Sequence, residues 1–241
     1  MQRLGIRRKA LITLLGVAVP SLLTFSLLII VSTAHILQQN AGRQVSTLAG
    51  RSALGLAELV ERSKTTLRTM AASPELTSYR TAVESGSRPA LKRSLADLER
   101  VFLGWQKLDS TIQAIRLIDP AGNVLVKIKE GQVNPPSGPP RPPYALPAVH
   151  FVGTRYFFKS AMQLPRGGIL ISNLERGKVE EEEVLCPGMV RFATPLFLTN
   201  GRRAGLLIIN VWSEQAGRLM NRVIAEEEGN AFLVERNPAD E

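Results

Sequence analysis

Cysteine and histidine are scarce in this sequence, with one cysteine, Cys186, and two histidines among 241 residues. A single thiol cannot form an intramolecular disulfide, and these three side chains cannot supply the four ligands of an ordinary zinc site. No hydrolase, kinase or nucleotide-binding motif is present either. The sequence therefore predicts no metal site, no cofactor and no catalytic residue.

Acidic residues are missing from the first 57 positions, which hold six of the 30 lysines and arginines. The net charge of +9 is concentrated there, because the rest of the chain has 24 basic against 21 acidic residues. A nucleic-acid-binding protein is expected to carry its basic surface on the folded domain. Nucleic acid is therefore not a predicted partner. We interpret the acidic run Glu180 to Glu183 as solvated charge, because it lacks the spaced ligands of a calcium loop.

A long uncharged segment follows the basic residues 1–9. Residues 10–32 are mostly aliphatic, and at 1.5 Å per residue they can cross ~30 Å of hydrocarbon as a transmembrane helix. The positive-inside rule then places the N-terminus in the cytoplasm and the remaining chain outside the inner (plasma) membrane. The alternative is a signal peptide cleaved after Ser32-Thr33-Ala34, although such peptides have apolar regions of only ~7–15 residues.

Residues 33–72 predict a stalk helix, because apolar side chains recur there at intervals of three and four. Gly42, Gly50 and Gly55 each cost about 1 kcal/mol relative to alanine, so tertiary or dimer packing is needed to hold the helix. We expect a parallel homodimer through Val45 to Val60. The stripe consists of Val45, Leu48, Ala49, Ala53, Leu56, Val60, Leu67, Met70 and Ala71.

Residues 73–227 predict an α+β domain. Ser73-Pro74-Glu75 is typical of a helix start, and a third helix after Gly86-Ser87 carries one apolar face. The strands alternate with turn residues such as Asn200-Gly201, which predicts an antiparallel five-stranded sheet. The helix face consists of Leu91, Leu95, Leu98, Phe102 and Trp105, with Leu108 close to it. The expected strands are Ile112–Ile118, Val124–Ile128, Ile169–Ser172, Met189–Leu198 and Ala204–Trp212, with a proline-rich loop at 133–147 and a short helix at Phe151–Met162.

The end of the sequence predicts a helix from Ser213 to Glu227, followed by a new strand at Ala231 to Val234. A strand that begins a few residues before the last residue, Glu241, is abrupt for a finished domain.

Several spaced residues in the second half resemble the double Cache sensor domains of bacterial receptors, which have a PAS-like fold. The matching residues are Gly177 and Glu180, then Pro187 with Val190, Arg191, Ala193 and Pro195, then Gly201, Gly205 and Leu206 to Asn210, together with Ile115 to Asp119 and Gly122-Asn123 upstream. The sequence departs from the pattern at Met189 and at Thr199. It also inserts residues 181–186 in the loop before Pro187. The resemblance covers roughly residues 35–236.

The resemblance implies a membrane-distal Cache module at 73–227 that binds a small ligand, and the start of a second module at 228–241. It implies the input region of a sensor histidine kinase, a diguanylate cyclase or a chemoreceptor, most often the kinase. The rival interpretation is a stand-alone membrane-anchored binding or scaffold protein without an output domain.

The predicted ligand-binding residues are Arg155, Tyr156, Phe158, Arg191 and Tyr144. Arginine offers a planar two-pronged donor for a carboxylate or phosphate, and aromatic rings exclude water around it. Relatives that sense amino acids carry an acid where this chain has Ser160, so a small carboxylate or another anion is the expected ligand. The alternative is that the phenylalanines pack the core and Arg155 pairs with a surface acid.

Overall fold

The computed structural model describes residues 6–175, 178–179, 182–183, 188–214 and 216–218. The chain divides into two units, Met1–Ala53 and Leu54–Glu241. Helix α1, Ile6–Ala71, begins in the first unit and ends in the second. The helix predicted from Ser213 to Glu227 is described only at residues 213–214 and 216–218, which are helical. The rest of that helix, the strand at Ala231 to Val234, the second module at 228–241 and Cys186 lie outside the described residues.

The N-terminal part of α1 is the one helix of the described chain that is long and apolar enough to cross a membrane. Its aliphatic side chains from Leu11 to Val31 are exposed, as expected for a surface suited to lipid rather than to a protein core. The helix continues through Pro20, whose carbonyl accepts a hydrogen bond from the Thr24 hydroxyl at 3.0 Å. The Ser21 hydroxyl donates to the Val17 carbonyl.

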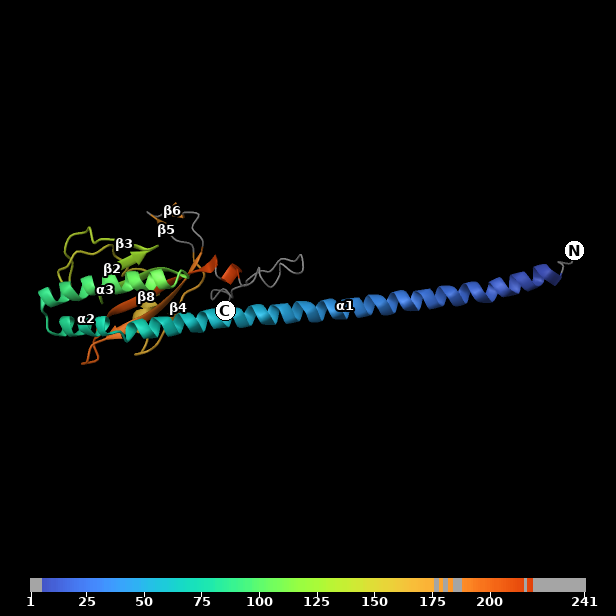
Figure 1. Ribbon diagram of the computed structural model, residues 1–241, viewed down its shortest axis with the longest axis horizontal. Coiled ribbons are helices and arrows are strands. Elements are labelled where there is room, and N and C mark those ends of the chain that lie inside the picture. The colour runs from blue at the N-terminus through green and yellow to red at the C-terminus, as the bar shows by residue number, and fades with distance from the viewer. Residues whose placement is uncertain (1–5, 176–177, 180–181, 184–187, 215, 219–241) are drawn as a thin grey trace. The chain divides into compact units, whose positions relative to one another are not determined.

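The second unit is built on a six-stranded antiparallel sheet of order β3-β2-β1-β8-β7-β4 (Figure 1). This confirms the α+β prediction, with one strand more than the five expected. The additional strand is β3, two exposed residues that pair with the end of β2. The strands are β1 Ile112–Ile118, β2 Val124–Lys129, β3 Gln132–Val133, β4 Leu170–Ile171, β7 Met189–Phe197 and β8 Arg203–Trp212. A separate two-stranded ladder joins β5 Lys178–Val179 and β6 Glu182–Glu183.

One face of the sheet is covered by the end of α1 and by helices α2, Pro74–Glu84, and α3, Arg88–Leu108 (Figure 1). The Ser73 cap is as predicted, since its hydroxyl accepts from the Leu76 amide at the start of α2. Ser87 caps α3 by accepting from the Ala90 amide. Leu98 and Phe102 are buried in α3, whereas Leu108 is 87% exposed because it lies in the last turn, beyond the sheet contact. The expectation for Leu108 was therefore wrong.

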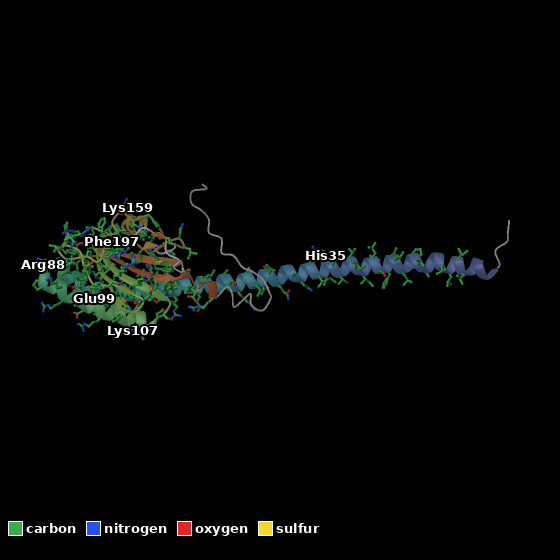
Figure 2. The ribbon with its side chains drawn as sticks, turned by 90° about the horizontal axis from the view of Figure 1, so that it is seen from above. His35, Arg88, Glu99, Lys107, Lys159 and Phe197 are labelled. Carbon is green, nitrogen blue, oxygen red and sulfur yellow. The ribbon has the colours of Figure 1, made fainter. Side chains whose placement is uncertain are left out.

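The opposite face is covered by α4, Tyr156–Gln163. Figure 2 shows Lys159 of α4 on one side of the domain and Glu99 and Lys107 of α3 on the other. The helix starts at Tyr156 rather than at the predicted Phe151, because the preceding backbone is bound to the β1–β2 turn. There Val152 donates to the Gly122 carbonyl at 2.8 Å, and Phe151 forms a bridge with Asn123.

Candidate functional site

The face of the sheet beneath α4 has an apolar end and a cationic end. At the apolar end, strand side chains pack against Phe157, Phe158 and Ala161 of α4, and together they form a closed hydrophobic cluster. This packing holds α4 in place by burying apolar surface. The strand residues of this cluster are Ile118, Val124, Ala193, Leu206 and Ile208.

The pairing of residues between neighbouring strands shows which basic side chains form the cationic end. Arg116 of β1 pairs with Lys127 of β2 on one side and with Ile208 of β8 on the other. Residues paired across neighbouring strands project to the same face, so Arg116 and Lys127 lie on the α4 face. Arg191 of β7 pairs with Asn210, which in turn pairs with Ala114 two residues before Arg116. The two arginines therefore lie on one face, in adjacent rows.

Arg191 is buried, and its side chain contacts a carboxylate and an aromatic ring. Its guanidinium forms an ion pair with Glu175, and its carbon Cζ lies 4.9 Å from the centre of the Phe157 ring. The Tyr156 hydroxyl donates to the same carboxylate. The side chains of Arg191 and Glu175 are only 6% and 19% exposed, so the pair is largely shielded from water. Removing either partner of such a pair would destabilise the fold, because the other charge would remain buried without a counter-charge.

Arg116 forms no ion pair within the described residues, and its buried Nε has no hydrogen-bond partner there. Burial, together with the positive charges of Arg191 and Arg155, lowers the pKa of Arg116 to about 10. Arg116 still carries its full charge near neutral pH, in surroundings that disfavour that charge.

The pKa values of two more basic groups, Lys127 and His150, are also lowered. Burial, Arg116 and Lys129 together lower the pKa of Lys127 to about 8, and burial, Arg116 and Lys127 lower that of His150 to about 4. His150 is therefore neutral near pH 7. Burial is the largest cause of all three shifts, and the neighbouring positive charges add to it, because a cation disfavours a second cation close by.

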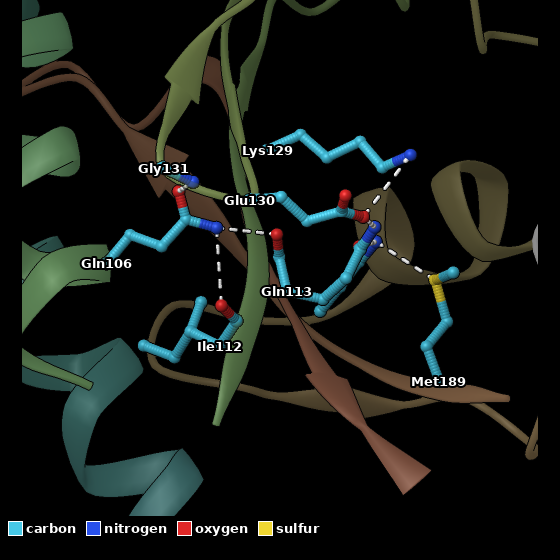
Figure 3. Close-up of polar contacts among 8 residues, drawn as sticks. Gln106, Ile112, Gln113, Lys129, Glu130, Gly131 and Met189 are labelled. Atoms are coloured by element: carbon cyan, nitrogen blue, oxygen red, sulfur yellow. Dashed lines mark hydrogen bonds and ion pairs between the residues drawn. The ribbon is translucent and has the colours of Figure 1, made fainter. Parts of the chain in front are cut away.

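The polar residues next to this cluster form a hydrogen-bonded network (Figure 3), in which the buried Asn210 Oδ1 has no partner among the described residues. Gln106 of α3 donates to the carbonyls of Ile112 and Gln113, where the β1 register shifts. The Asn210 amide donates to the Gln113 side chain at 3.0 Å, and Gln113 donates to Glu130 at 3.3 Å. This network holds the start of β1, where its register with β8 shifts between Ile112 and Ala114.

The predicted site residues divide into two groups. Arg191, Tyr156 and Phe158 lie at or beside the α4 face, and Arg155 is the exposed cap residue of α4, close enough to influence Arg116. Tyr144 is not with them: it packs against the helix-side core, and its hydroxyl donates to the Ala204 carbonyl at 3.3 Å. Phe157 and Phe158 pack the core, as in the alternative interpretation. Arg155 has no ion pair among the described residues.

Sequence reasoning missed Arg116, Lys127, His150 and Glu175. The signal for the first two was available, because each is a basic residue inside a strand whose other positions are almost all buried. Basic residues are rarely placed in such strands unless they are paired or functional. Glu175 had no such signal, since it lies in a loop after β4. Within the described ranges, no group of three His, Cys, Asp or Glu side chains could hold a metal ion.

No protein-family model and no curated protein sequence matches this chain. The fold is similar to solved sensor domains. The extracellular domain of vpHK1S-Z8, a candidate histidine kinase, is 19% identical over 76% of this chain and 63% of that one, with a TM-score of 0.57. A domain of a candidate sensory box/GGDEF family protein from Vibrio parahaemolyticus is 21% identical over the same shares, with a TM-score of 0.54.

A third similar structure is the ligand-binding domain of the Campylobacter jejuni chemoreceptor Tlp3 in complex with L-norvaline, which is 11% identical over 74% of this chain and 63% of that one (TM-score 0.51). The chain therefore spans less than two thirds of the length of these sensor domains. The predicted resemblance to Cache-type sensor domains is confirmed at the level of the fold.

Proposed function

We propose that this chain is the membrane-anchored, extracytoplasmic ligand-sensing region of a signal-transduction receptor. The apolar part of α1 supports the anchor, and the fold shared with kinase, GGDEF and chemoreceptor sensor domains supports the sensing role. In this proposal residues 1–9 are cytoplasmic, 10–32 span the membrane and 33–72 form a dimeric stalk. Residues 73–227 are the sensor module, and 228–241 begin a second module.

The single observation that carries the ligand class is the imbalance of charge beneath α4. Arg116, Lys127 and Arg191 share that face, and Glu175 is the only carboxylate that pairs with any of them in the described chain. Burying an uncompensated charge is unfavourable, and a bound anion would supply the missing negative charge. We therefore infer that the ligand is a small carboxylate or another small anion.

Each site residue has a distinct role in this proposal. Arg116 and Lys127 contact the anion directly, and Arg155 adds positive potential at the mouth. Arg191 is held by Glu175 and Tyr156, so it sets the shape of the site, while Phe158 seals the apolar end. Tyr144 has no part in it, because it packs against the other side of the sheet.

An amino acid is the competing ligand, because Glu175 could accept an ammonium group. Its carboxylate, however, already receives Arg191 and the Tyr156 hydroxyl. An ammonium would have to compete with both, so the unpaired cations favour an acid without an amino group.

The output is proposed to be a sensor histidine kinase, with a diguanylate cyclase or a chemoreceptor as alternatives. Anion binding beneath α4 would shift the sheet and the end of α1 between two arrangements. A stand-alone anchored binding protein would bind the same anion without this consequence.

A thermal-shift screen of the full chain in detergent tests the proposal. An organic acid at ~100 times its dissociation constant should add ~2.7 kcal/mol to the free energy of unfolding. Arg116→Met should abolish this gain. It should also leave the unliganded protein as stable as before or more so, because it removes an unpaired buried charge. Lys159→Met is the matched control, since Lys159 is an exposed cation on α4 (Figure 2), and it should keep the full gain.

Three outcomes would contradict the proposal. If amino acids stabilise the protein and simple acids do not, the argument from charge is wrong. If Lys159→Met loses the response as fully as Arg116→Met, binding is nonspecific. If no anion stabilises the protein, the α4 face is not a ligand site.

A further inference from the structure

A second group of arginines surrounds a separate hollow of about 340 Å³. Arg68 from the last turn of α1, Arg80 from α2 and Arg166 from the turn between α4 and β4 line this hollow, and Phe197 of β7 forms part of its wall. All four residues belong to the second unit. Neither Arg116 nor Lys127 lines it, so it is distinct from the site beneath α4.

Two of these guanidinium groups are fixed in place by main-chain carbonyls. Arg80 donates from Nη2 to the Ala71 carbonyl at 3.0 Å and from Nε to the Leu76 carbonyl at 3.2 Å. Arg166 donates to the Leu198 carbonyl at 3.1 Å, and its Cζ lies 5.0 Å from the centre of the Phe197 ring. Fixed donors of this kind lose little conformational freedom when a ligand binds.

The charge of this group is not balanced within the described residues. None of the three arginines forms an ion pair there, and the Arg68 side chain forms no hydrogen bond within the described residues. The Glu84 carboxylate is close enough to influence Arg80, but it already accepts the Thr199 hydroxyl at 2.7 Å. Burial and the charge of Arg166 lower the pKa of Arg80, which is consistent with an excess of positive charge.

We propose that this hollow is a second anion-binding site, which takes a compact oxyanion carrying two or more negative charges, such as pyrophosphate or a polycarboxylate. Guanidinium groups bind paired oxygens of carboxylates and phosphates through planar, two-pronged contacts. Three of them from three different elements can contact several oxygens of one ligand. A hollow of this volume lies within the range of small-molecule sites.

Occupation of the second site would connect the end of α1 to the sheet, because Arg68 belongs to the helix and Arg166 directly precedes β4. A ligand that binds more tightly to one arrangement of these elements shifts the equilibrium toward it. The second site therefore supplies an input to α1 that is independent of the ligand beneath α4.

Isothermal titration calorimetry of the full chain in detergent, with sodium pyrophosphate at constant ionic strength, tests this proposal. Arg68→Gln should weaken binding at least tenfold, because it removes a charge-assisted contact without breaking an internal hydrogen bond. Arg166→Gln should have a comparable effect. Arg93→Gln removes the same charge from an exposed position of α3 and should change the affinity less than twofold. Arg116→Met should leave pyrophosphate binding to this site intact.

Acetate, with one negative charge, should bind at least tenfold more weakly than pyrophosphate. The proposal is overturned if pyrophosphate does not bind, or if Arg93→Gln weakens binding as much as Arg68→Gln. It is also overturned if Arg116→Met alone removes binding, since the anion would then occupy the site beneath α4. An unchanged circular dichroism spectrum for each variant ensures that a loss of affinity is not a loss of fold.

Discussion

The two faces of the sheet differ in how they are filled. The face beneath α1, α2 and α3 is packed almost entirely by aliphatic and aromatic side chains, with Leu98, Phe102 and Tyr79 at most 1% exposed. The one buried hydroxyl among these three, that of Tyr79, donates to the Ala204 carbonyl at 2.8 Å. On the face beneath α4 the apolar packing stops partway, and Arg116, Lys127 and Arg191 follow.

This difference separates the part of the domain that stabilises the fold from the part that costs stability. Apolar burial contributes about 1.5–3 kcal/mol per large side chain, whereas an unpaired buried cation opposes folding. The packing on the helix side can therefore offset the cost of a second face that carries buried and half-buried charges. Substitutions on the two faces should behave differently.

The largest effect is expected on the helix side. Phe102→Ala should lower the free energy of unfolding by about 3–5 kcal/mol, because it leaves a cavity at a fully buried position. Denaturant unfolding of the full chain in detergent measures this. Leu108→Ala in the same helix is the control and should cost less than about 0.5 kcal/mol, since Leu108 is exposed. Equal losses would contradict the assignment of this face as the core.

Glu175→Gln should have the next largest effect, a loss of about 3 kcal/mol, because it leaves Arg191 buried without its counter-charge. The same unfolding measurement applies. The double variant Glu175→Gln with Arg191→Met should recover most of the loss, since it removes both charges. A loss below about 1 kcal/mol in the single variant would show that the pair is not shielded from water.

A smaller, pH-dependent effect is expected at His150. Its pKa is about 4 in the folded chain against an ordinary 6.5, because burial and the charges of Arg116 and Lys127 disfavour protonation. As the pH falls from about 6.5 to about 4, the unfolded chain takes up the proton first, so stability falls. We expect a contribution of about 1 kcal/mol, since His150 is partly open to solvent.

His150→Gln isolates this contribution from the other groups that titrate in the same interval. The variant should lose less stability than the parent protein between pH 7 and pH 4.5, as measured by thermal unfolding. An identical loss in both proteins would show that burial and the charges of Arg116 and Lys127 do not lower the pKa of His150.

The smallest effect is expected for Tyr144→Phe, at about 0.5 kcal/mol. The Tyr79 hydroxyl remains to satisfy the Ala204 carbonyl, and the Tyr144 bond to it is the longer of the two, at 3.3 Å. The thermal response to organic acids should be unchanged. If Tyr144→Phe removed that response, the ligand would bind on the helix side and the contrast between the faces would be wrong.

Most of the fold could be predicted because it depends on local patterns. Alternating β-rich runs and turn residues located β1, β2, β7 and β8 to within a residue or two. The Ser73 cap located the start of α2, and Gly86-Ser87 located that of α3. The strand β3 could not be predicted, since two exposed residues carry no periodic signal. The start of α4 depended on a long-range contact between Phe151 and the β1–β2 turn, which no local pattern reveals.

The candidate site was only partly predictable, because its assembly depends on strand register. The chemistry of arginine beside aromatic residues indicated Arg191 and the start of α4, but Arg116 required knowing which face of β1 it occupies. With both faces buried, the strand shows no polar alternation from which to read this. The side on which Tyr144 lies depends on the path of the proline-rich loop, and composition alone does not determine that path.

The joint between α1 and α2 has a mechanical consequence. The first helix stops at Ala71 and the second starts at Pro74, and the Arg80 guanidinium spans this gap by bonding to carbonyls on both sides. Bending the joint would break the bond to Ala71, while the bond to Leu76 within α2 holds the guanidinium in position, so the two helices form a stiff elbow. A torque applied to α2 through its buried Tyr79 would therefore reach the end of α1 as a rotation, instead of being absorbed at the turn.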